Sequence, residues 1–317
     1  VAALSTAQIT ALDSGQIAVL TSKQMAALGT VQIGVLPTGA IAGLTTLQVA
    51  ALNTAAVAAL NTAQIAALTT AQAEALTTLQ VAALTSAQLA ALGADDLATF
   101  STKDMAAIGS LAVDGLSTDV IATLSTAQIA ALSTIAITGL STKQIDALTT
   151  AQVEALGTGQ VAVLNSTQLA VLSPEDIATF ATKDIAAISA GAMSGLSTAA
   201  IGALTSAQVA ALTTSGIGGM STKQVAALAV AQFAAMNTTQ IAALSSAQIG
   251  VIATSTLATL STSQVAALGA STVTGLTSNQ MDALNSGQVE ALTTSQVASL
   301  SSAQLAMLTS QDIASFS

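Results

Sequence analysis

Few side chains in this sequence could do chemistry, and most of those are carboxylates. The 317 residues include 15 Asp and Glu and five Lys, with no His, Cys, Tyr, Trp or Arg. Imidazole, thiol and phenol groups are the usual general bases, nucleophiles and soft metal ligands in proteins. We therefore predict that the protein is not an enzyme and uses no cofactor or small-molecule substrate. We also predict no catalytic, cofactor-binding or metal-binding residues.

The densest group of carboxylates occurs twice, with the same internal spacing in both copies. Its members are Asp95, Asp96 and Asp104, and then Glu175, Asp176 and Asp184. Hard oxygen ligands of this kind could bind calcium, but the spacing is not that of an EF-hand loop. The same carboxylates fall in the first turns of two successive predicted helices, where the helix dipole favours negative charge. We favour this structural interpretation.

The five lysines all stand at the third place of the repeat described below, so we expect them to share one solvated face. They are Lys23, Lys103, Lys143, Lys183 and Lys223. Lys143 and Asp146 stand three residues apart and could pair. The formal net charge is −10 and the pI about 4.1, so the positive surface that phosphate backbones and anionic lipids require is missing. We predict no nucleic-acid partner.

A repeat of eight residues runs through the chain without insertion or deletion. From Ser5 to Phe316 it fills 39 octads with the consensus Ser/Thr-Thr-Ala-Gln-Ile/Val-Ala-Ala-Leu. Positions five and eight are large and apolar almost everywhere, and Ala73 is the small exception at position five. We therefore predict that these two positions form the core. All four phenylalanines occupy them: Phe100, Phe180, Phe233 and Phe316.

The apolar spacing alternates five and three, which fits neither a strand nor a continuous helix, so the chain must change direction once per octad. In the first octad Ser5 can cap a helix, Gln8 can close a capping box, and Leu4 can pack on Ile9. Pro174 falls at the first helical position, where proline is tolerated best. We predict an all-α solenoid with one capped helix of about five to seven residues per octad.

A β-solenoid is the alternative architecture. Thr, Val and Ile favour strands, and short periodic repeats often form β-helices. Several positions of the octad are occupied by Ala or Gln, which strands do not favour. This composition makes the helical solenoid our first choice.

Stacking of neighbouring coils must stabilise helices this short, because they do not form in isolation. Small Ala residues at positions three, six and seven allow close approach. Gly occupies position seven in pairs that stand three octads apart, Gly115 with Gly139 and Gly195 with Gly219. This spacing suggests about three octads per coil.

A repeat array has no single closed core, so its length does not predict a number of domains. We expect residues 1–317 to form a single octapeptide-repeat solenoid. The opening residues, Val1 to Leu4, match the tail of a preceding octad, so we expect a segment of a longer array with any secretion signal outside it. No apolar run approaches the roughly 18–20 residues of a membrane-spanning helix.

The octads at 61–68 and 125–132, Asn61-Thr-Ala-Gln-Ile-Ala-Ala-Leu68 and Ser125-Thr-Ala-Gln-Ile-Ala-Ala-Leu132, resemble octapeptide arrays of very large secreted bacterial exoproteins. Those proteins are often labelled heme-utilisation or adhesion exoproteins. The resemblance extends over the whole chain and implies secretion and a role at the cell surface, in a matrix or in a filament. The heme label finds no support in a chain without His, Cys or Tyr.

Low charge and the resemblance together favour an extracellular or cell-surface structural protein: a filament, sheath or adhesin stalk. We expect its partners to be copies of itself, because only 6% of its residues are charged and little repulsion keeps copies apart. The alternative is a soluble surface-binding array, similar to an ice-binding solenoid. In that case recurring Thr methyl and hydroxyl groups beside Ala methyls would form the binding face.

Overall fold

Every octad forms one short helix in the computed structural model, which describes residues 1–315. The helices are α1 to α38 and one 3₁₀ helix, η1, and no strand occurs within these residues. The predicted all-α solenoid is confirmed, and the β-solenoid alternative is wrong. The α-helices span four to six residues, slightly fewer than expected, because the backbone is already extended at position eight.

The capping box predicted from the sequence begins most of these helices. In the octad at 125–132 the Gln128 backbone N–H donates to Ser125 Oγ at 3.2 Å, and the Ser125 N–H donates to Gln128 Oε1 at 2.9 Å. Both bonds satisfy backbone donors that have no partner within the helix. The cap therefore defines where each helix starts.

The corner between helices is made by two extended residues and needs no left-handed conformation. Leu132 closes one helix at φ −55° and ψ 134°, and Ser133 caps the next at φ −65° and ψ 155°. No residue of the described range has a positive φ. Many helices end on a left-handed glycine, whereas here the corner accepts a large Leu whose side chain enters the core.

The chain divides into two compact units, residues 1–160 and a second unit that begins at Val161. Within each unit a helix contacts the helix three octads further on, as α26 contacts α29. Three octads therefore complete one coil, as the glycine pairs suggested. The prediction of one solenoid over 1–317 concerns how the two units join, and it stays a prediction.

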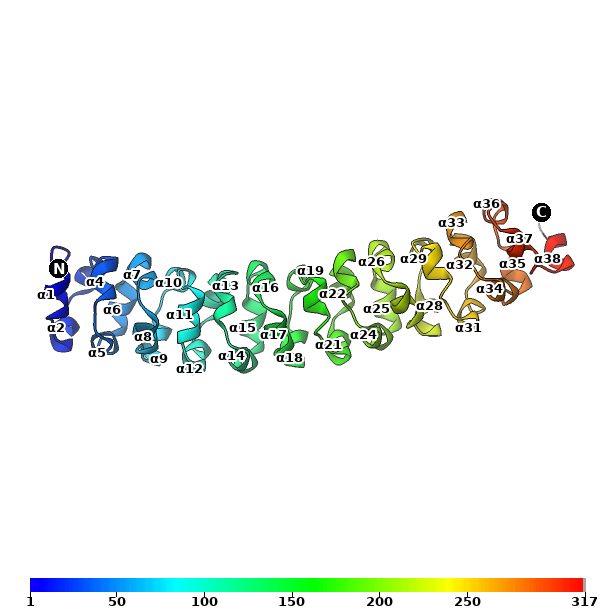
Figure 1. The fold of residues 1–317 in the computed structure, drawn as a ribbon. Helices are drawn as coiled ribbons and strands as arrows, with labels where there is room; N and C mark the ends of the chain where they lie inside the picture. Colours follow the sequence, from blue (N-terminus) through cyan, green and yellow to red (C-terminus); the bar gives the residue numbers. More distant parts are fainter. Residues whose placement is uncertain (316–317) are drawn as a thin grey trace. The chain divides into compact units, whose positions relative to one another are not determined.

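The first unit contains three columns of stacked helices. In Figure 1, α7, α10 and α13 of its first column follow one another along the upper edge. The first column comprises α1 (Thr6–Thr10), α4 (Thr30–Gly34), α7 (Thr54–Ala58), α10 (Thr78–Ala82), α13 (Thr102–Ala107), α15 (Thr126–Ala131) and α18 (Thr150–Glu154). The second comprises α2 (Ser14–Ala18), α5 (Thr38–Ala42), α8 (Thr62–Ala66), α11 (Ser86–Ala91), η1 (Val113–Gly115) and α16 (Thr134–Gly139). The third comprises α3 (Ser22–Ala26), α6 (Thr46–Ala51), α9 (Thr70–Glu74), α12 (Ala94–Ala98), α14 (Thr118–Thr123) and α17 (Thr142–Asp146).

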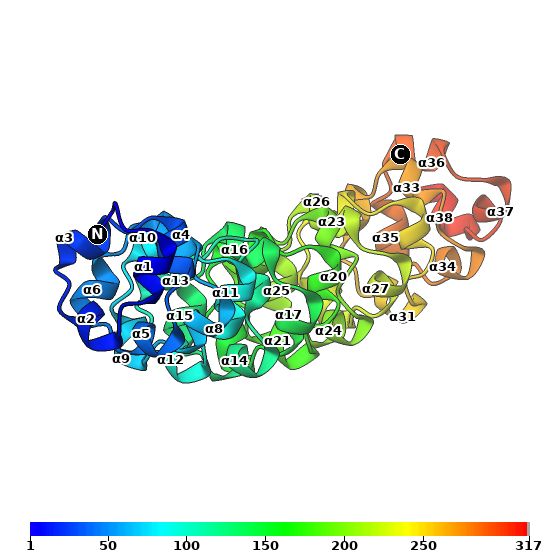
Figure 2. The same cartoon turned by 60° about the vertical axis from the view of Figure 1, so that its left-hand side comes forward.

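Figure 2 shows α9, α12 and α14 of the third column in a row.

Helix α19 (Thr158–Ala162) contains the boundary between the units. The second unit repeats the three-column arrangement. Its first column comprises α20 (Ser166–Leu169), α23 (Ala190–Met193), α26 (Thr214–Gly219), α29 (Thr238–Ala242), α32 (Thr262–Ala267), α35 (Ser286–Glu290) and α38 (Ser310–Ser315). The second comprises α21 (Pro174–Thr179), α24 (Thr198–Ala203), α27 (Thr222–Ala226), α30 (Ser246–Ile249), α33 (Ala270–Val273) and α36 (Thr294–Ala298). The third comprises α22 (Thr182–Ala187), α25 (Ser206–Ala211), α28 (Val230–Ala235), α31 (Thr254–Leu257), α34 (Ser278–Asp282) and α37 (Ser302–Leu305).

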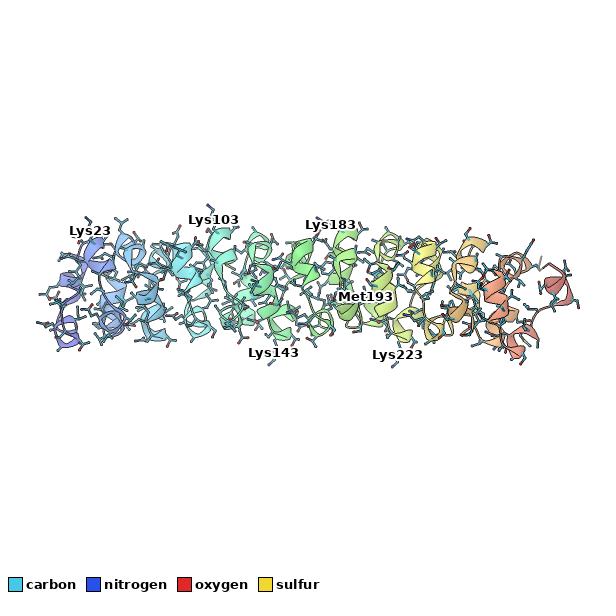
Figure 3. All side chains as sticks on the ribbon, turned by 90° about the horizontal axis from the view of Figure 1, so that it is seen from above. Lys23, Lys103, Lys143, Lys183, Met193 and Lys223 are labelled. Atoms are coloured by element: carbon cyan, nitrogen blue, oxygen red, sulfur yellow. The ribbon has the colours of Figure 1, made fainter. Side chains whose placement is uncertain are left out.

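The core of each unit is built from positions five and eight, as predicted. In the octad at 61–68 Ile65 is 0% exposed and Leu68 is 6% exposed. Phe100, Phe180 and Phe233 are buried as well, whereas Phe316 lies outside the described residues. Met193 occupies the core of the second unit in the same way (Figure 3). These three Phe side chains therefore stabilise the fold and do not form an exposed stacking surface.

At two of the position-seven glycines, Gly115 and Gly139, neighbouring coils approach very closely. A Cβ added to Gly139 would lie 2.1 Å from the carbonyl oxygen of Ser110, and one added to Gly115 would lie 2.0 Å from that of Ser86. No side chain fits in this space. These glycines are therefore required for packing between coils.

Candidate functional surface

The Gln side chain at position four connects neighbouring coils. Gln240 is 1% exposed. Its Oε1 accepts from the Asn237 N–H at 2.9 Å, and its Nε2 donates to the carbonyls of Val209 and Leu212 at 3.0 and 2.7 Å. One amide thus caps the start of α29 and the end of α25 in the preceding coil. We call this arrangement the Gln clamp.

The Gln clamp recurs through both units with the same register. Each Nε2 donates to carbonyls that lie 28 to 31 residues earlier in the chain, at positions five, six and eight. The residues are Gln32, Gln48, Gln64, Gln72, Gln80, Gln88, Gln128, Gln144, Gln152 and Gln160 in the first unit. In the second unit they are Gln208, Gln224, Gln232, Gln240, Gln248, Gln264, Gln280, Gln288, Gln296 and Gln304. Because the otherwise unsatisfied carbonyls at helix ends are paired in this way, short helices become stable as a stack.

In the acidic clusters noted from the sequence, Asp96, Asp104, Asp176 and Asp184 replace Gln at position four. Asp104 Oδ2 accepts from the Ser101 N–H at 3.1 Å and from Ser101 Oγ at 2.6 Å. Its other oxygen accepts from Thr78 Oγ1 in the preceding coil at 2.7 Å. Asp176 likewise accepts from the Ser173 N–H at 3.0 Å. The carboxylates therefore lie in first turns as helix caps, as the structural interpretation expected.

The lysines do not share one face, and that prediction was wrong. Lys23 in α3 and Lys143 in α17 belong to the third column of the first unit, whereas Lys103 in α13 belongs to the first column. In the second unit Lys183 and Lys223 also belong to different columns. Figure 3 shows Lys103 and Lys143 projecting from opposite edges of the first unit. Octad position alone does not determine a face, because three octads make a coil.

The outward surface of each unit consists of positions one, two, three and six. One column carries threonine at position two in seven successive coils, all of them exposed. This threonine ladder is Thr6, Thr30, Thr54, Thr78, Thr102, Thr126 and Thr150. The sequence showed that threonine recurs, but the coil length was needed to place these seven residues in one column.

Large apolar side chains interrupt the small residues at position three of the first unit. They are Val31, Leu47, Leu79, Leu111 and Ile135, between 65% and 88% exposed. Leu111 and Ile135 stand three octads apart, in neighbouring coils of the second column. This surface is therefore both poor in charge and locally apolar.

Two further observations concern metals and membranes. Among residues 1–315 no three side chains of the His, Cys, Asp and Glu types come together as a metal-binding group. Within the same range, none of the helices has the length and apolar character needed to cross a bilayer.

The stacked capped helices define the chain as a structural protein of the helical repeat class. The ALTTAQ repeat family model matches residues 1–30, 41–78, 121–158, 177–214, 217–254 and 281–317. These segments cover more than half of the sequence, and the chain belongs to the ALTTAQ repeat family. A comparison with curated proteins finds no match.

Proposed function

We propose that the protein is an extracellular, non-enzymatic structural component that self-associates into a filament, sheath or adhesin stalk. The observation that carries this proposal is the outward surface, where Ala, Thr and Ser alternate with exposed apolar residues such as Leu111, 88% exposed. Where such residues lie in neighbouring coils, as Leu111 and Ile135 do, a larger exposed apolar patch would be expected to be covered by a partner. The resemblance to secreted exoprotein arrays supports the proposed location.

A second copy of the chain is the partner that this surface fits best. Only 6% of the residues are charged, so two copies can approach laterally with little electrostatic repulsion. The small side chains of this surface leave room for close van der Waals contact with a second copy. High salt should not dissolve such contacts, because screening acts only on charges.

Charge added to the outward face tests the proposal. Ala63, Ala127 and Ala207 all stand exposed at position three, outside the core. Replacing the three with Lys should leave the circular dichroism of the helices unchanged and shift the protein from large assemblies to smaller species. Replacement of the same residues with Ser is the matched control and should leave assembly intact. If the unsubstituted chain forms no assemblies in electron micrographs, the proposal is wrong.

The threonine ladder supports a second candidate, in which the array binds an ordered, uncharged surface such as ice. Seven exposed threonines at the same place in successive coils present methyl and hydroxyl groups at a regular spacing. This function predicts a soluble monomer that inhibits ice growth. Replacing Thr54 and Thr126 with Lys should abolish the inhibition, whereas the same change at Thr62, in another column, should not.

A further inference from the structure

Two asparagines of the second unit stand in the acceptor motif for N-linked glycosylation, Asn-Xaa-Ser/Thr. The sequence contains six asparagines, and the motif occurs at Asn165-Ser-Thr167 and Asn237-Thr-Thr239. Both asparagines are N-cap residues, of α20 and α29, and both are exposed. They lie in the same column of that unit, three coils apart.

The side chains of both motifs adopt the same arrangement. Thr167 Oγ1 donates to Asn165 Oδ1 at 2.6 Å, and Thr239 Oγ1 donates to Asn237 Oδ1 at 2.6 Å. The same Oδ1 atoms accept the capping N–H of Gln168 and Gln240, at 3.0 Å in each case. Every one of these bonds uses the carbonyl oxygen of the asparagine amide. The Nδ2 group is therefore not needed for the helix cap.

The other asparagines at the first octad position all lack the acceptor motif, and one of them also uses its Nδ2 group as a hydrogen-bond donor. Asn53 Nδ2 donates to the carbonyls of Ala26 and Leu28, at 3.1 and 3.2 Å, so its amide nitrogen is used for packing between coils. Asn61 caps α8 through Oδ1 as Asn237 does, but Ala63 stands where the motif requires a hydroxyl. Asn285 is followed at that place by Gly287.

We propose that Asn165 and Asn237 are sites of N-linked glycosylation. In the reaction Nδ2 attacks the anomeric carbon of a sugar carried on a diphosphate donor, such as a nucleotide sugar or a lipid diphosphate sugar. The new carbon–nitrogen bond replaces the bond to the diphosphate, which departs, and Nδ2 loses one proton to a base of the transferase. No oxidant or reductant is needed. Oδ1 remains free to cap the helix, so the modified chain keeps its fold.

The consequence is that one column of the second unit carries both sugars. A bulky polar group at Asn165 and another at Asn237 would keep that column solvated and leave the other two columns for contact with partners. The proposal does not rest on self-association, since the modification would occur equally on a monomer.

Peptide mass spectrometry of the protein purified from the cells that produce it tests the proposal. Sugar mass is expected on the peptides that contain Asn165 and Asn237, and none on those that contain Asn53, Asn61 or Asn285. Thr239→Ala, which makes this octad like that of Asn61, should abolish modification of Asn237 and leave that of Asn165 unchanged. Ala63→Thr completes a motif and should add sugar at Asn61.

Several results would overturn the proposal. Unmodified peptides at Asn165 and Asn237, or sugar attached to Ser or Thr hydroxyls in their place, would show that these asparagines are not acceptors. Retention of the sugar on Asn237 in Thr239→Ala would also contradict it, because the motif hydroxyl would then be irrelevant. Because Ala is the consensus residue at position three, Thr239→Ala should fold, and circular dichroism checks that it does.

Discussion

The Gln clamp makes a quantitative prediction about the stability of each coil. Gln240→Glu keeps an oxygen that caps the Asn237 N–H but removes the Nε2 donor to the carbonyls of Val209 and Leu212. The two hydrogens of Nε2 are shared among these carbonyls and that of Ala210, at 3.2 Å, so the loss amounts to two hydrogen bonds of about 0.5–1.5 kcal/mol each. An unsatisfied buried polar group adds a cost of about 1–3 kcal/mol, and a carboxylate that faces carbonyl oxygens costs more than a neutral group. The free energy of opening should therefore fall by at least about 2–6 kcal/mol at neutral pH.

Native-state hydrogen exchange is the appropriate assay, because stability in a repeat array is local. Amides of residues 205–212 and 237–244 should exchange faster in Gln240→Glu, and the first unit should be unaffected. Gln24→Glu is the matched control: Gln24 is exposed, and its Oε1 accepts from the Thr21 N–H at 2.8 Å. It should change the opening free energy by no more than about 0.5 kcal/mol. Equal effects of the two substitutions would refute the role given to the clamp.

The remaining predictions concern close packing, acid stability and calcium. Gly139→Ala places a Cβ 2.1 Å from the Ser110 carbonyl oxygen and should destabilise its coil by about 3 kcal/mol in urea unfolding. Gly39→Ala, where nothing lies within 4 Å, should be neutral or stabilising by up to about 1 kcal/mol, and equal losses would contradict the close approach. The Thr309 hydroxyl, followed by its backbone N–H, holds the pKa of Asp312 below its ordinary value, so the stabilisation is present above about pH 4 and is lost as the pH falls through the folded pKa. The loss of stability in Thr309→Ala should accordingly shrink in acid, and a pH-independent loss would contradict this origin. A calcium chelator should leave the melting temperature unchanged, whereas a large decrease would show that the carboxylates around Asp104 bind the ion.

Much of the fold follows from local chemistry that the sequence displays directly. A helix cap is encoded within four residues, as in Ser125 and Gln128, and the core positions are encoded by size alone. The glycine pairs also indicate which octads stack on one another. Gly115 and Gly139 stand three octads apart because their coils are stacked, and this is the coil length of the structure.

The Gln clamp could not be recognised in this way, because its partners lie 28 to 31 residues away. The capping box accounts for the carbonyl oxygen of the Gln side chain, but it predicts no partner for the Nε2 group. One correlation within the sequence does reflect the presence or absence of the clamp. Glycine at position seven occurs only in octads without Gln or Asp at position four, and the residue 29 places earlier is then Ser or Ala. These glycines are Gly43, Gly115, Gly139, Gly195, Gly219 and Gly275. At all of these glycines except Gly43, the coils approach so closely that small residues are required on both sides.

The outward surface was the hardest feature to predict. The assignment of the lysines to one face assumed that residues at the same octad position point in the same direction. The three octads of one coil point in three different directions. The threonine ladder shows the reverse case. Threonine is common at position two of the sequence, but its unbroken column can be recognised only when the coil length is known. Column membership is a property of the stack and cannot be seen within a single octad.

Sedimentation velocity of the unmodified chain at micromolar concentration tests the proposed self-association most directly. We predict species much larger than a 30.7 kDa monomer that persist when the salt concentration is raised. A stable monomer under the same conditions would contradict the account, because it would show that the charge-poor outward surface does not bind a second copy.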